Sequence, residues 1–315
     1  MSADGIAATQ SPGPLSAGGV IHDRGYRRYD GERLGRFQIV RALGWHSFRS
    51  AFGIGRGPKA KIVPVIAFVA LCLPAVINTV GLARGGTSVV SYGTYTFALR
   101  VVVMIIFVAV AAPELVSRDL RSRVLPLYFS RPLRRGDYPL AKYVAFTLAC
   151  LAMVEIPLLL LYLGSIAAGG GGVPVPTQTT ELAGGLAVGL MWAVLLAAIG
   201  LAIASLSARR AYATGAVAIF FFLTWTLSTI ISNVSGRTAG ALVPAQATAG
   251  ERLGGLLSPF TVIDGIRQWL GGNHPVPGPI PSPGGYGAAY AVVFVVLLAA
   301  SFATLAARYR RTDLI

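Results

Sequence analysis

The residues best suited to binding chemistry gather in one hydrophilic segment, residues 114–142, which reads ELVSRDLRSRVLPLYFSRPLRRGDYPLAK. It holds six arginines, one lysine and three acids, and a long apolar run lies on either side of it. Guanidinium groups form charge-assisted, often bidentate hydrogen bonds with carboxylates and phosphates. Crossing a bilayer requires no such segment. We therefore expect it to form a cytoplasmic surface on which another molecule docks.

Catalytic and metal-binding patterns are missing from the sequence. It has no G-x-x-x-x-G-K-[ST] phosphate loop, no H-E-x-x-H helix and no G-x-S-x-G elbow. The two cysteines, Cys72 and Cys150, lie in apolar runs, and His22, His46 and His274 are scattered without ligand spacing. We expect no enzymatic activity, no metal and no cofactor in this chain, so that any energy it uses comes from a partner.

Two charged residues, Arg100 and Glu155, lie deep inside apolar runs. Ionisable residues inside a membrane are costly and are usually functional. Glu155 either lines a substrate path or pairs with Arg100 within the helix bundle, and the sequence leaves both readings open. Two such residues are too few for a proton relay.

The composition identifies the class of protein that holds these residues. Of 315 residues, 54% are hydrophobic and only 12% are charged, and the mean hydropathy is +0.66. This is typical of a polytopic membrane protein, because about a quarter of the residues of a soluble domain are charged. The formal charge of +15 would fit a nucleic-acid partner in a soluble protein, but here the bases flank apolar spans, so we expect no nucleic-acid binding.

Six segments are long and apolar enough to cross about 30 Å of hydrocarbon. They are residues 62–82, 95–113, 144–167, 182–205, 211–231 and 287–307. The predicted fold is therefore an all-α membrane protein, a six-transmembrane-helix bundle that occupies residues 62–315. No cleavable signal peptide is evident in residues 1–20, so the first span is expected to act as the targeting signal.

Basic residues set the predicted orientation. The amino-terminal segment, the second and fourth connections and the carboxy terminus together carry 22 lysines and arginines, whereas the first, third and fifth connections carry four. The positive-inside rule then places both termini and the connection 114–142 in the cytoplasm. We expect a multi-pass protein of the cell membrane, plasma or inner.

The amino-terminal segment divides into two parts. Residues 1–32 have the composition of a disordered cytoplasmic tail. Residues 33–61 read as an interfacial amphipathic helix followed by a glycine-rich linker. The predicted helix places on one face a set of apolar residues: Leu34, Phe37, Trp45, Phe48 and Phe52. The alternative is a solvated helix that packs on other cytoplasmic loops.

The fifth connection, residues 232–286, is a long external loop in this topology. Residues 253–270 have amphipathic helical spacing, and Pro259 is expected to start or kink a helix there. We expect this loop to cap the bundle. No internal repeat is evident, which gives no support to an inverted-repeat secondary transporter.

The segment 114–142 resembles the cytoplasmic loop of the six-span permeases of ABC-type exporters, the type-two permease family. An acid, Glu114, ends the second span, and the matching positions are Arg118, Asp119, Leu125, Leu127, Ser130, Arg131, Pro132, Arg135, Tyr138 and Lys142. The sequence departs from the family pattern in two places. Ser122, Arg123 and Val124 stand where Gly-Thr-Leu is usual, and Pro126 interrupts the stretch that follows.

The resemblance implies a coupling helix in this loop that docks on a separate ATP-binding subunit. The residues implied in that coupling are Glu114, Arg118, Asp119, Arg121, Arg123, Ser130, Arg131, Pro132 and Arg135. The alternative reading is that the arginines only anchor the loop to anionic lipid headgroups.

The resemblance also implies an assembly. It would contain two ATP-binding subunits, which hold ATP and Mg, and a second permease, identical or related, in a surrounding of membrane lipid. Its function would be export from the cytoplasm or the inner leaflet. The alternatives from other classes are a transporter driven by an ion gradient and a non-transporting membrane assembly factor.

Overall fold

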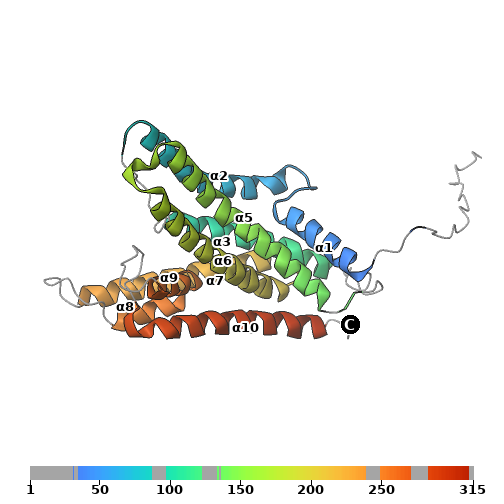
Figure 1. The fold of residues 1–315 in the computed structure, drawn as a ribbon. Coiled ribbons are helices and arrows are strands. Elements are labelled where there is room, and N and C mark those ends of the chain that lie inside the picture. Colours follow the sequence, from blue (N-terminus) through green and yellow to red (C-terminus); the bar gives the residue numbers. More distant parts are fainter. Residues whose placement is uncertain are drawn as a thin grey trace, which may run out of the picture. The chain divides into compact units, whose positions relative to one another are not determined.

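The described part of the chain folds only into helices, with no strand in it (Figure 1). This computed structural model describes residues 31, 35–86, 97–122, 133–134, 136–238, 249–270 and 283–311. The α-helices are α1 (Arg36–Ala51), α2 (Lys59–Ala83), α3 (Phe97–Arg121), α5 (Asp137–Ala167), α6 (Val175–Ser205), α7 (Arg210–Thr238), α8 (Ala249–Gly254), α9 (Pro259–Leu270) and α10 (Gly287–Arg311). Short 3-10 turns are η1 (Gly170–Gly172), η2 (Gly255–Leu257) and η3 (Gly284–Tyr286). All these elements belong to one compact unit, Gly35–Ile315.

Six of these helices are long and apolar enough to cross a membrane, namely α2, α3, α5, α6, α7 and α10. They coincide with the six predicted segments, which confirms a helical membrane protein with six candidate spans. Two begin seven residues earlier than predicted: α5 at Asp137 rather than at residue 144, and α6 at Val175 rather than at residue 182. The hydropathy pattern ends at the first polar residues, whereas the backbone hydrogen bonding of the helix continues through them.

Four prolines lie inside the spanning helices without ending them: Pro64, Pro74, Pro113 and Pro157. In water a proline inside a helix is strongly disfavoured. In lipid a break would expose backbone groups that have no water to bind, so helices continue past proline where neighbouring groups satisfy the backbone.

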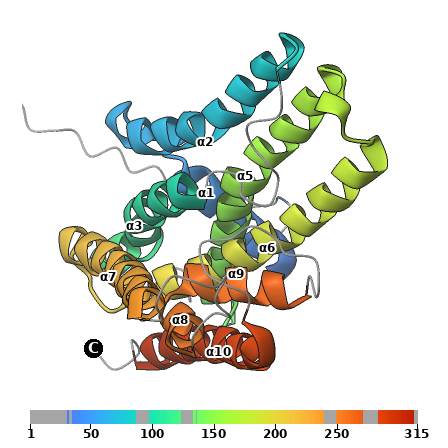
Figure 2. The same cartoon turned by 90° about the vertical axis from the view of Figure 1, so that its left-hand side faces the viewer.

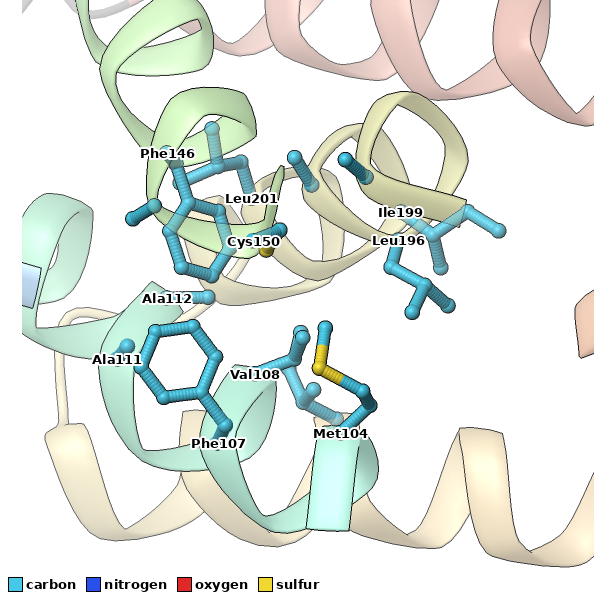
Figure 3. Packing of buried hydrophobic residues seen from close by; sticks show 14 of the residues in the cluster. Met104, Phe107, Val108, Ala111, Ala112, Phe146, Cys150, Leu196, Ile199 and Leu201 are labelled. Atoms are coloured by element: carbon cyan, nitrogen blue, oxygen red, sulfur yellow. The ribbon is translucent and has the colours of Figure 1, made fainter. Parts of the chain in front are cut away.

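The core lies between α3, α5 and α6. Within the most apolar part of α3, 72% of the residues are buried, against 17–22% in α2, α7 and α10. Figure 3 shows Met104, Phe107 and Val108 of α3 facing Phe146 and Cys150 of α5, with Leu196 and Ile199 of α6 beside them. Gly200 allows this approach, because a Cβ there would lie 2.6 Å from Cγ1 of Val108. The outer helices therefore keep broad apolar faces for lipid or for a partner.

Helix α1 packs against the spans α5 and α3. Its buried side chains are Leu43, Ser47, Ser50 and Ala51, whereas Phe37 is 75% exposed and Trp45 is 62% exposed. The sequence had placed these aromatic residues on the single apolar face of the helix. Two of them are instead left uncovered by the protein, which is the arrangement that an interfacial helix needs in order to bury them in lipid.

Helix α9 lies in the predicted external loop and begins at Pro259, as expected. Nine of its twelve residues are buried, and it packs against α6, α7 and α10. Figure 2 shows α9 lying across the bundle beside α10. Thr261 donates a hydrogen bond to the Gly255 carbonyl at 2.6 Å and shares one with Ser228 of α7 at 3.1 Å. The helix is therefore part of the packed structure.

Candidate functional site

The predicted docking segment starts at the carboxyl end of α3 and finishes at the amino end of α5. In Figure 1 these two ends lie on the same side of the bundle as α1 and the carboxyl end of α10, and we call this side the loop end. Glu114, Arg118, Asp119 and Arg121 lie on α3. The other predicted coupling residues, Arg123, Ser130, Arg131, Pro132 and Arg135, lie outside the described residues.

Glu114 is a buried junction of three segments, with only 9% of its side chain exposed. One carboxylate oxygen pairs with Arg56, in the linker between α1 and α2, and the other pairs with Arg210 at the start of α7. Arg56 also donates to Ser50 of α1 at 2.7 Å. A buried carboxylate is costly unless paired, and removing one partner typically costs 3–5 kcal/mol. The acid therefore fastens α1, α3 and α7 together at the loop end.

Asp119 joins the two ends of the docking segment. Its Oδ2 accepts a hydrogen bond from the Tyr138 hydroxyl at 2.6 Å and forms an ion pair with Lys142 Nζ at 2.8 Å, both on α5. Lys142 is almost completely buried. The Tyr138 ring packs edge to face on Tyr309 of α10 at 5.4 Å between centroids. The two ends of the segment are thus held together by an ion pair and a hydrogen bond, and the aromatic contact joins α5 to α10.

A third carboxylate, Asp137, fixes α1 to the first turn of α5. It accepts from Arg36 Nε at 2.6 Å and from the Arg134 backbone N–H at 2.9 Å. An acid in a first helical turn also meets unpaired backbone N–H groups and the positive end of the helix dipole. The Arg36 side chain is 44% exposed, so this pair contributes less than the buried ones.

The three acids therefore point into the protein, whereas basic residues of α3 point away from it. Arg118 and Arg121 are exposed on the last turns of α3, while Ser117 beside them is buried and donates to the Ala204 carbonyl at 3.0 Å. Glu114 and Asp119, both predicted to couple to a partner, are already engaged within the chain. They are suited to position the docking segment, and the arginines are left to make contacts outside the chain.

Arg100 and Glu155 lie inside the bundle, away from the loop end. The Arg100 guanidinium is buried and lies 4.7 Å from the centroid of the Trp192 ring of α6. Both oxygens of Glu155 are buried without a hydrogen-bond partner among the described residues. They lie against Gly189, where a Cβ would come within 2.0 Å of Oε1. A direct Glu155–Arg100 hydrogen bond is thus absent from the described structure, and a role in a substrate path stays a prediction.

The sequence did not identify Arg56 and Arg210 as functional residues. They lie 58 residues before and 96 residues after Glu114 in the chain, so no local pattern connects the three. One signal was present: an acid at the edge of a span must find a cation, and Arg210 directly precedes a predicted span while Arg56 lies six residues before another on the same predicted side. That signal restricts the candidates without choosing among the many bases there.

The sequence matches the family described as ABC-2 family transporter protein over residues 33–314. The chain belongs to this family. No curated protein matches it. The family confirms the resemblance first seen in residues 114–142: this is a multi-pass membrane permease of the ABC-2 type, and such a permease belongs to an ABC transporter system with an ATP-binding partner.

Proposed function

We propose that this permease is the membrane subunit of an ATP-driven exporter and that the segment 114–142 couples it to the ATP-binding subunit. The permease moves substrate out of the cytoplasm or the inner leaflet of the cell membrane. Two ATP-binding subunits hold ATP and Mg and hydrolyse the nucleotide, and a second permease, identical or related, completes the assembly. The chain itself has no enzymatic activity and holds no cofactor.

The observation that carries this proposal is the separation of charge at the loop end. Glu114 and Asp119 are satisfied by Arg56, Arg210 and Lys142, so Arg118 and Arg121 project from a rigid base with no need to neutralise these acids. A basic surface on a fixed helix end suits charge-assisted contacts to an acidic groove. This surface can also transmit a movement of the partner to the helix bundle, because its base is joined to α1, α5 and α7.

The proposed orientation rests on the basic residues. Arg56 and Arg210 meet on Glu114 at the loop end, and the Arg134 backbone contacts Asp137 there. Lys59 and Lys61 at the start of α2 are exposed. The positive-inside rule assigns this side to the cytoplasm, where ATP is available.

The test is a double charge reversal, Arg121→Glu with Arg123→Glu. Charge-assisted contacts at such an interface are worth about 1.5–3 kcal/mol each, so affinity for the ATP-binding subunit should fall about tenfold or more. The measurement is recovery of that subunit with the tagged permease, together with substrate-stimulated ATP hydrolysis. The matched control is Lys59→Glu with Lys61→Glu, which changes the same charge on exposed residues of α2.

Loss of recovery in the first variant and not in the control supports coupling through the segment. If both variants recover as much ATP-binding subunit as the wild type and show the same stimulation, the arginines only anchor the loop to lipid. If no ATP-binding subunit is recovered even with the wild-type permease, a transporter driven by an ion gradient or a membrane assembly factor becomes the better reading.

A further inference from the structure

An apolar groove of about 670 Å³ runs between α1 and the first half of α5. Helix α1 contributes Phe37, Val40, Gly44, Trp45 and Phe48, together with one base, Arg41. Helix α5 contributes a stripe at helical spacing, Leu140, Val144, Leu148, Leu151 and Ile156, with small alanines between them. The groove is thus apolar, with one cation on its α1 wall.

The dimensions of the groove select its occupant. From Leu140 to Ile156 the helix rises about 24 Å, and one leaflet with its headgroups is about 20–22 Å deep. Dividing 670 Å³ by this length gives a mean cross-section of about 28 Å². A helix with its side chains is at least about 10 Å wide, so it would cover the groove and not lie within it. An extended methylene chain, which packs at roughly 4–5 Å from its neighbours, needs about 20 Å².

The charge of Arg41 then indicates which kind of lipid the groove would bind. Arg41 lies on α1 between Arg36, which is paired with Asp137 at the start of α5, and Gly44, where a Cβ would be 3.9 Å from the Ala141 carbonyl oxygen. It therefore belongs to the loop end of the groove. Arg41 is exposed and makes no hydrogen bond or ion pair within the described ranges. An unoccupied guanidinium at the mouth of an apolar channel fits a phosphate headgroup.

Among the described residues that line the groove, the one acid does not oppose this charge. Glu155 lies near its far end, where both carboxylate oxygens are buried against Gly189 of α6. About 22 Å of helix separates its position from that of Leu140, so it is remote from the mouth. The groove is therefore basic at one end and apolar along its length.

We propose that this groove binds one acyl chain of an anionic phospholipid of the inner leaflet, with the phosphate headgroup on Arg41. The bound lipid completes the contact between α1 and α5 and holds α1 at the membrane surface. The inference rests on the proposed orientation and on membrane residence, and it does not require the coupling segment to contact an ATPase.

Trp45 provides the measurement, because it lines the groove and is itself exposed. The full-length permease is reconstituted into vesicles of zwitterionic phospholipid to which a brominated-chain lipid is added, either phosphatidylglycerol or phosphatidylcholine. Bromine quenches tryptophan on contact, and subtracting the signal of Trp45→Phe isolates the contribution of Trp45. Quenching by the anionic lipid should reach half its maximum at a mole fraction about fivefold lower than quenching by the zwitterionic one, the effect of one basic residue at an anionic surface.

Three variants make the result specific. Arg41→Glu should abolish the preference for the anionic lipid, and Arg41→Lys should retain most of it. Arg49→Glu is the matched control, since Arg49 is exposed on the same helix but does not line the groove. Val144→Phe fills the groove without adding a tryptophan and should reduce quenching of Trp45 by both lipids.

Equal half-quenching by the two lipids, or an unchanged preference in Arg41→Glu, would overturn the proposal. So would undiminished quenching of Trp45 in Val144→Phe. If brominated chains fail to quench Trp45 in the wild type, the groove is covered by protein, for which a second copy of the permease is the first candidate. Failure of the Arg121 and Arg123 reversal to affect ATPase recovery would leave this result intact, so the two proposals fail separately.

Discussion

Three carboxylates, Glu114, Asp119 and Asp137, hold the loop end together, and each is paired with a base from another segment of the chain. Of these, Glu114 has the strongest need of its partners, because it is buried and forms ion pairs with two arginines at once. A buried carboxylate that keeps its partners lowers the stability of the fold little. An arginine that loses its carboxylate near the hydrocarbon destabilises the fold by the full free energy of its desolvation. Among the three acids, Glu114 is therefore the one whose replacement should lower stability most.

Glu114→Gln should destabilise the permease by about 3 kcal/mol, the low end for breaking a buried pair. The low end is appropriate because the Arg210 side chain is 59% exposed and can turn to water, while Arg56 cannot. The measurement is thermal or denaturant unfolding of the purified permease in detergent. Glu181→Gln is the matched control, since Glu181 is an exposed acid on α6 and its replacement should leave the transition unchanged. A stability loss equal to that of the control would mean that Glu114 is solvated.

At the scale of elements, α1 has two different faces. Leu43, Ser47 and Ser50 pack on the bundle, and Phe37 and Trp45 face outward. Exposed aromatic residues of this size on a short helix are costly in water and favourable at a membrane surface. The packing of α1 on the spans α3 and α5 favours the interfacial helix over a helix packed on cytoplasmic loops.

Replacing Phe37 and Trp45 together with Ser should lower the amount of assembled permease and its transport, while the six spans still insert. Only interfacial burial is lost, at roughly 1.5–3 kcal/mol per large apolar side chain that was fully buried in lipid. The measurement is membrane-inserted permease, its recovery in the assembly, and transport. Gln38→Ser on the same helix is the control, since Gln38 is exposed and polar. Unchanged assembly and transport would support the solvated-helix reading.

For the whole molecule, orientation is the property on which the other proposals depend. The described structure gathers the ion pairs of α1, α3, α5 and α7 at one end and places α9 at the other. Only the count of bases, 22 against four, states which end faces the cytoplasm.

Cysteines introduced on the two ends test this assignment. Thr179→Cys, on the exposed start of α6, should react with an impermeant maleimide added to intact cells. Ser122→Cys and Ala208→Cys, both at the loop end, should react only after the cells are opened. Native Cys150 is fully buried and native Cys72 is partly covered, and the unmodified permease serves as the baseline. External labelling at position 122 would invert the topology and remove the basis of the coupling proposal.

Much of the architecture was available from the sequence. Six apolar runs predicted six spans, and residues 114–142 carried the family resemblance. Both are local properties: a span must be apolar along its whole length, and a docking motif is read within one segment. The start of α9 at Pro259 is local in the same way, since proline is accepted in the first turn of a helix.

The partners of the charged residues were decided only by the tertiary structure. Nothing near Glu114 in the chain names Arg56 or Arg210, and nothing near Asp119 shows that Lys142 is buried against it. These contacts depend on how each helix is rotated about its axis, and the packing of α3 against α5 and α6 sets that rotation. The sequence thus determined the six candidate spans and the segment that is predicted to dock. Packing determined that the acids turn inward and that the arginines of α3 remain available, because a buried charge must be paired wherever the fold allows.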